Sequence, residues 1–134
     1  MTDNLEKYVT SPIDTEPAAL SEELAHGAAI LYQASMKVAS ALQDYQIKKL
    51  ALKRAEASVD QKFRREAAES NTRLTEGAIA SATALSPEVQ EAYDALNQAS
   101  YTLDQAKALY EAVRERLWDI HKLVEMNKQE MMLT

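Results

Sequence analysis

Residues 86–126 read SPEVQEAYDALNQASYTLDQAKALYEAVRERLWDIHKLVEM, and this stretch predicts one long helix. Ser86 can cap a helix, Pro87 suits the first helical position, and Glu88 is favourable at the positive end of the helix dipole. An apolar side chain then recurs at alternating steps of three and four residues, as in a coiled-coil seam. We therefore expect a helix over about 87–128.

Two apolar rows make up this seam. Steps of seven from its start give Val89, Leu96, Leu103, Tyr110, Leu117, Val124 and Met131. The alternate row is Ala92, Ala99, Ala106, Val113 and Ile120, and Asn127 is the one polar residue among the seam positions between 89 and 127. A helix of this length is roughly 60 Å long, which is too long for a single compact globule of this size.

A second long helix is predicted upstream, over about 18–69. Steps of seven give the apolar row Leu24, Leu31, Val38, Tyr45, Leu52 and Val59. We take the alternate row as Ala28, Ser35, Leu42, Lys49, Glu56 and Phe63. Because Lys49 and Glu56 are charged, the apolar face of the helix is expected to be narrower in its second half. A glycine inside a helix costs about 1 kcal/mol relative to alanine, so Gly27 indicates close packing.

The rest of the chain completes an all-α prediction. Residues 70–85 favour a short helix around 74–83, and residues 1–17, which Pro12 and Pro17 interrupt, are expected to be a flexible N-terminal arm. Two glycines and three prolines are too few for a fold rich in hairpins and β-turns. We expect two long helices, at about 18–69 and 87–128, joined by a short helical segment, within a single domain over 18–134.

Self-association is the expected state, because two long helices cover only one seam of each other. A second apolar stripe would remain exposed, formed by Ile30, Ile47, Leu50, Tyr93 and Leu123. Exposed apolar stripes usually mark an interface. The alternative is a monomeric helical hairpin or three-helix bundle.

The residues needed for most kinds of chemistry are missing from the sequence. There is no cysteine, no phosphate-binding glycine loop and no nucleophile motif, and His26 and His121 are not spaced as metal ligands. We interpret acidic residues such as Glu22 and Glu23 as lying on solvent-exposed faces of helices. We expect no catalytic site, cofactor, metal or small-molecule substrate. No run of about 18 apolar residues or signal peptide is apparent, which favours a cytoplasmic protein without membrane contact.

The uneven distribution of charge is the most informative functional feature. The net charge is −6, yet residues 37–73 hold nine basic residues against five acidic ones. Phosphates attract such a segment, and unpaired bases can stack on an aromatic ring such as Phe63. The candidate DNA-binding residues are Lys48, Lys49, Lys53, Arg54, Lys62, Arg64 and Arg65. The alternative is a solvated helix face that pairs internally with Glu56, Asp60, Glu66 and Glu69.

Several segments resemble a known family. They are KKLALKRA (48–55), the stretch from TEG to SPEV (75–89), and YEAVRERLWDIHKLVEM (110–126), with ILY near residue 31 and PID at 12–14. Over about 20–126 the chain resembles the recombination mediator proteins of T-even-type bacteriophages, the UvsY-like family. Lys48, Lys49 and Lys53 match basic positions of that family, whereas the second key basic position falls near Ala55, one place after Arg54.

The resemblance implies a role in recombination. Such mediators bind single-stranded DNA, form ring-like homo-oligomers, and help a RecA-like recombinase to displace single-strand-binding protein. The implied partners are therefore single-stranded DNA, further copies of the chain, a recombinase and a single-strand-binding protein, in the cytoplasm of a host cell. Two other functions stay open: a helical scaffold or assembly protein, and a protein-binding inhibitor, neither with nucleic-acid affinity.

Overall fold

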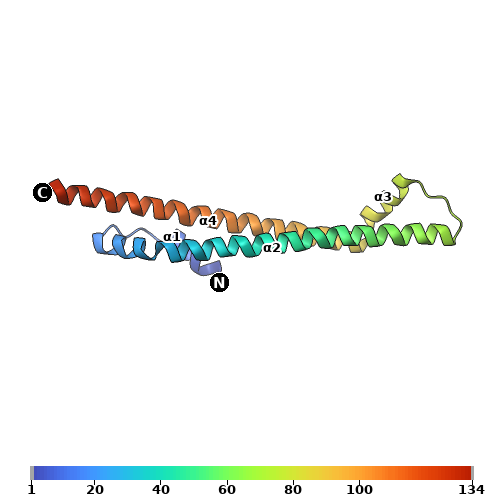
Figure 1. The fold of residues 1–134 in the computed structure, drawn as a ribbon, viewed down its shortest axis with the longest axis horizontal. Helices are drawn as coiled ribbons and strands as arrows, with labels where there is room; N and C mark the ends of the chain where they lie inside the picture. Colours follow the sequence, from blue (N-terminus) through green and yellow to red (C-terminus); the bar gives the residue numbers. More distant parts are fainter. Residues whose placement is uncertain (1, 134) are drawn as a thin grey trace. The chain divides into compact units, whose positions relative to one another are not determined.

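The computed structural model describes residues 2–133, and its regular elements are four α-helices. These are α1 (Thr2–Thr10), α2 (Pro17–Glu69), α3 (Glu76–Leu85) and α4 (Pro87–Leu133), as Figure 1 shows. The described residues include no strand, which confirms the all-α prediction. The two long helices and the short helix between them lie close to their predicted bounds, and α4 continues a few residues beyond residue 128.

Local signals set the helix ends around α3. Helix α2 ends where Asn71 adopts a positive φ of 54°, a conformation that asparagine tolerates at a helix C-terminus. The Thr72 amide then donates to the Ala67 carbonyl at 2.8 Å. At the other end, the Ser86 amide donates to the Thr83 carbonyl at 3.1 Å, while its carbonyl accepts from Gln90 at 2.9 Å. A single residue therefore separates α3 from α4.

The contacts divide the chain into two compact units. Unit 1 comprises residues 2–40 and 104–133 of the described chain, and unit 2 comprises residues 41–103. Helices α2 and α4 each contribute one part to each unit, and within a unit these parts run antiparallel (Figure 1). Unit 1 also contains α1, and unit 2 contains α3.

Two apolar clusters form the interior of unit 1. One is centred on Leu5, Ala34 and Val113, and the other on Leu20, Ile120 and Val124. Ile30 packs against the first cluster and Leu123 against the second. These two residues were expected in an exposed stripe, and that expectation is wrong, because α1 and the segment that follows it add a third layer over α2 and α4.

Helix α1 is an element for which we expected no regular structure. Leu5 is buried, with 4% of its surface exposed, and Tyr8 and Val9 pack against the same cluster. The spacing of these three residues is helical, but it covers one turn and was too short to recognise. The first residues of the chain therefore contribute to the interior of unit 1.

The buried face of α2 differs from the predicted one in its second row. The row that begins at Leu24 is buried or half-buried throughout, as expected. Its companion row is formed by Leu20, Gly27, Ala34 and Ala41, which are all buried, whereas Ala28, Leu42, Lys49 and Glu56 of the predicted row are exposed. The companion row lies three residues after each member of the first row, not four, and its small side chains concealed it.

Gly27 shows why small side chains lie along this row. A Cβ atom added at Gly27 would lie 2.8 Å from Cδ2 of Leu117 on α4. Real Cβ atoms keep a larger separation than this, so the glycine allows α2 and α4 to approach closely here. The prediction of close packing at Gly27 is confirmed.

Unit 2 has a thinner interior, to which all three of its helices contribute. The buried apolar residues are Ala41 and Val59 from α2, Ile79 from α3, and Val89, Ala99 and Leu103 from α4. Helix α3 lies against the hairpin of α2 and α4 at its closed end (Figure 1). The candidate DNA-binding residues, from Lys48 to Arg65, all fall within this unit.

Candidate nucleic-acid interface

All seven predicted DNA-binding residues lie on the part of α2 that belongs to unit 2. Lys49, Lys53, Arg54, Lys62, Arg64 and Arg65 are exposed, and Lys48 is half-buried. Lys49 and Lys53 are one turn apart and share a face, while Arg54 and Arg65 are three turns apart and share another. The structure therefore brings the cations onto one helix segment but divides them between two of its faces.

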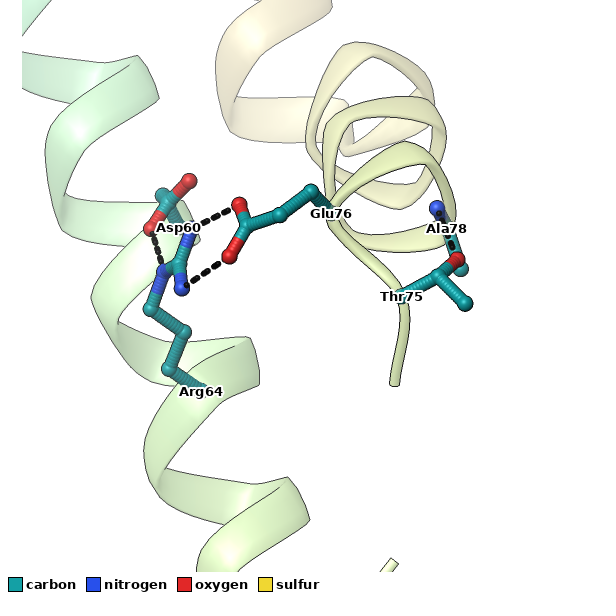
Figure 2. Close-up of polar contacts among 5 residues, drawn as sticks. All are labelled: Asp60, Arg64, Thr75, Glu76 and Ala78. Atoms are coloured by element: carbon teal, nitrogen blue, oxygen red, sulfur yellow. Dashed lines mark hydrogen bonds and ion pairs between the residues drawn. The ribbon is translucent and has the colours of Figure 1, made fainter. Parts of the chain in front are cut away.

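Arg64 differs from the other six because its guanidinium is bound by two carboxylates. Nε donates to Asp60 at 2.6 Å, and the two terminal nitrogens donate to the two oxygens of Glu76 at 3.0 and 2.6 Å. Figure 2 shows the Arg64 side chain between these two acids. The hydrogen bonds raise the pKa of Arg64, and the same bonds lower the pKa of Glu76 below its usual range.

The Arg64 contacts attach α3 to α2. Glu76 is the first residue of α3, and the Thr75 hydroxyl caps the helix by accepting from the Ala78 amide at 3.1 Å (Figure 2). A carboxylate in the first turn is also favourable to the helix dipole. Arg64 therefore binds the first residue of α3. It could bind a phosphate only by giving up its hydrogen bonds to Asp60 and Glu76.

The alternative of internal pairing applies to one cation only. Asp60 pairs with Arg64, as that alternative expected. Within the described residues 2–133, none of the other six cations has a carboxylate within 4.0 Å. Five of the predicted cations are thus exposed and without an ion pair in this part of the chain.

The aromatic residue near these cations is a different one from that expected. Phe63 is half-buried, so its ring is not an open stacking surface. Tyr93 at the start of α4 is 51% exposed, and Tyr101, two turns later, is 60% exposed. Tyr93 was expected in the second apolar stripe, and its exposure agrees with that expectation, but the sequence does not reveal that it lies near α2.

A groove brings Tyr93 and Lys53 to the same place. It has a volume of about 870 Å³ and lies between α2, α3 and the start of α4. Its lining includes Lys53, Glu56 and Asp60 from α2, Thr83 from α3, and Tyr93 from α4. One of the predicted DNA-binding cations, Lys53, therefore lies in the wall of a groove.

Unit 1 contains a buried cation that the sequence did not reveal. Arg116 is 8% exposed, and its Nε donates to Glu23 at 2.7 Å. It also donates to the Ser11 and Pro12 carbonyls at 2.5 and 3.5 Å, and its guanidinium lies over the Tyr8 ring at 4.6 Å. Glu23 is therefore part of the interior and not of a solvated face, which corrects that expectation.

The charges of this cluster are reflected in two pKa values. Burial raises the pKa of Tyr8 to about 12, and the nearby Glu23 carboxylate adds to the effect. Burial alone would lower the pKa of Arg116, but the hydrogen bond and charge of Glu23 raise it overall. The cluster joins α1, α2 and α4 within unit 1, which is a structural role.

The two histidines have different neighbours. Nδ1 of His26 is 2.8 Å from the Glu22 carbonyl, and the His121 ring lies 6.1 Å from that of Trp118. No group of three or more histidine, cysteine or acidic side chains in the described chain is arranged to hold a metal ion. None of the helices over residues 2–133 combines the length and apolar character needed to cross a membrane.

Comparisons of the chain with protein-family models, curated proteins and solved structures found no match.

Proposed function

We propose that this protein binds single-stranded DNA through the exposed cations of α2 in unit 2 and acts as a recombination mediator. The observation that carries the proposal is that Lys49, Lys53, Arg54, Lys62 and Arg65 are exposed and have no carboxylate within 4.0 Å in the described chain. Although the chain has a net charge of −6, such a segment of exposed cations creates a local positive potential that attracts a polyanion.

The division of the cations between two helix faces favours a flexible strand over a rigid duplex. A single strand can follow cations on both sides of one helix, because its backbone bends over a few nucleotides. A duplex presents its phosphates at fixed spacing and would reach one face at a time. Each phosphate neutralised on a single strand adds about 0.7 to the dependence of log affinity on log salt.

The mediator role rests on the resemblance of the KKLALKRA segment, residues 48–55, to the UvsY-like recombination mediators. By that resemblance the protein would help a RecA-like recombinase onto DNA that single-strand-binding protein covers. This role requires binding and release of a strand, and it requires no catalytic group.

Self-assembly is the second part of the proposal, and exposed apolar side chains support it. They occur in both units: Tyr32, Met36, Trp118 and Met126 in unit 1, and Ile47, Leu50 and Leu85 in unit 2, each at least 48% exposed. Assembly into a ring-like homo-oligomer would cover such side chains and would place several cationic segments along one strand. Linked weak sites then act together through a high effective concentration.

The test is fluorescence anisotropy of a labelled single strand and its duplex, titrated at several salt concentrations. The double variant Lys53→Glu, Arg54→Glu should bind the single strand at least tenfold more weakly. The slope of log affinity against log salt concentration should be smaller in magnitude by about 1.4, which corresponds to two lost phosphate contacts. The matched control is Lys107→Glu, Arg114→Glu, which makes the same change of charge on α4 in unit 1. Equal losses of affinity in the two variants would mean that binding depends on the net charge of the protein and not on a site at Lys53 and Arg54.

The scaffold function is the alternative, and the same exposed apolar side chains favour it. A scaffold would assemble in sedimentation experiments yet show no affinity for either form of DNA at low salt. That result would overturn the DNA-binding proposal. A single-strand preference that is lost in the Lys53, Arg54 variant, with assembly unchanged, would support it.

A further inference from the structure

The groove of unit 2 is large enough to hold part of a nucleotide strand. Its volume of about 870 Å³ falls within the range of about 300–1,000 Å³ that is typical of small-molecule sites. Alanines and Val89 form the aliphatic part of its wall, and polar or charged residues make up about half of the lining. A flat, partly polar ligand suits such a surface.

Thr83 provides the first specific feature of the groove. The residue is 7% exposed and lines the groove, and its Oγ1 is buried without a hydrogen-bond partner among the described residues. A buried hydroxyl without a partner is unfavourable, so a bound group that supplied a hydrogen bond there would be stabilised. This hydroxyl can both donate to a ring nitrogen or carbonyl and accept from an amino group.

The charges along the groove determine which part of a nucleotide could enter. Glu56 and Asp60 line it together with a single cation, Lys53. Two carboxylates oppose the entry of a phosphate, but they accept hydrogen bonds from the exocyclic amino groups of bases. Asp60 gives one oxygen to Arg64, which fixes the orientation of its carboxylate.

Tyr93 and Lys53 suit the two other parts of a nucleotide. The Tyr93 side chain lines the groove and is 51% exposed, so it is accessible to a stacking partner. Lys53 lines the same groove and belongs to the cationic segment, so it can hold the phosphate next to a base that has entered.

We propose that this groove receives one unpaired nucleobase that carries an exocyclic amino group, such as cytosine, and that the base stacks on Tyr93 and hydrogen-bonds with Thr83. This inference rests on the proposed binding of single-stranded DNA and deepens it. The phosphates would remain on the exposed cations of α2, of which Lys53 alone lines the groove. Base and backbone would thus be bound by different residues of unit 2.

The first experiment compares three labelled strands of equal length and equal phosphate number: oligo(dC), oligo(dT), and an abasic strand. Anisotropy titrations at slightly alkaline pH, where oligo(dC) stays unstructured, should show that affinity decreases from oligo(dC) to oligo(dT) to the abasic strand. Oligo(dC) should bind at least fivefold more tightly than the abasic strand. Binding of all three with equal affinity would overturn the base site while leaving the phosphate-based proposed function intact. Absence of binding to any strand would overturn both.

The second experiment assigns the preference to the groove. Thr83→Val keeps the side-chain shape without the hydroxyl, and Tyr93→Ala removes the stacking ring. Each should weaken oligo(dC) binding about threefold to tenfold or more, while affinity for the abasic strand stays within twofold. Unchanged abasic binding also shows that the variant is folded.

Tyr101→Ala is the matched control, because Tyr101 is similarly exposed on the same helix but does not line the groove. Loss of the dC preference in the Thr83 and Tyr93 variants, but not in the Tyr101 variant, would support the assignment. Equal effects of Tyr93→Ala and Tyr101→Ala would overturn it, as would equal affinity for oligo(dC) and oligo(dT).

Discussion

Replacing Glu23 by glutamine should destabilise unit 1 strongly. The Glu23 carboxylate lies 2.7 Å from Nε of Arg116, and the side chains of the two residues are 18% and 8% exposed. The variant keeps the shape of the side chain but removes its charge. The Arg116 guanidinium then remains buried without a counter-charge.

The magnitude follows from burial and from the contacts that remain. Breaking a buried ion pair by neutralising one member costs about 3–5 kcal/mol. Arg116 keeps its hydrogen bonds to the Ser11 and Pro12 carbonyls and its position over the Tyr8 ring. We therefore expect the lower end of that range, about 3 kcal/mol.

Urea unfolding followed by tryptophan fluorescence measures this loss. Trp118 is the only tryptophan, and it belongs to unit 1. With a urea dependence of about 1–3 kcal/mol per molar, the midpoint should fall by about 1–3 M. The protein concentration must be fixed, because self-association would shift the midpoint by mass action.

The control is Arg114→Met, two residues from Arg116 on the same helix. Arg114 pairs with Glu111 at 3.8 Å, and both side chains are more than half exposed. Loss of an exposed pair costs less than about 1 kcal/mol. If Glu23→Gln and Arg114→Met move the midpoint equally, the buried network is not what holds α1 and α2 to α4 in unit 1.

Three further predictions concern packing and pH. Gly27→Val should destabilise unit 1 by about 1–3 kcal/mol in urea unfolding, whereas Gly77→Ala should stabilise unit 2 by about 1 kcal/mol, because an added Cβ at Gly77 meets no atom within 4 Å. The pKa of Tyr8 is raised to about 12, so the stability of the fold should fall as the pH rises from about 10 to about 12, because Tyr8 loses its proton at lower pH in the unfolded chain. Titration followed by ultraviolet absorbance should show one tyrosine that ionises at higher pH than the others, and Tyr8→Phe should lack it. The pKa of Glu76 is lowered, so its stabilisation of α3 is complete above pH 4.5 and is lost as the pH falls through the lower pKa of the folded state. Amide hydrogen exchange in α3 should become faster in that pH range. The variant Arg64→Gln should remove this pH dependence.

The helices themselves could be predicted from the sequence because their signals are local. Pro87 begins α4 as predicted, and α2 ends at Glu69, which is also its predicted end. Helix propensity, capping and the seven-residue repeat act over a few neighbouring residues. The bounds of α2 and α4 therefore needed no tertiary information.

The choice of the second buried row on α2 needed the structure. Both Leu42 and Ala41 are apolar, and the periodicity fits either a step of four or a step of three from the row of Leu24. The structure buries Ala41 and leaves Leu42 41% exposed. Close approach to α4, which Gly27 permits, favours small residues over large ones, and the sequence alone gives no sign of this distance.

The sequence by itself determined that the chain is helical, where its long helices lie, and that its cations concentrate in one segment. Only the tertiary structure decided which of those cations are available. Arg64 meets Glu76 across 12 residues and Arg116 meets Glu23 across 93, whereas Lys53 meets no carboxylate within 4.0 Å in the described chain. Charge is a property of each residue, but an ion pair depends on which distant segment comes within about 3 Å, and packing sets that distance.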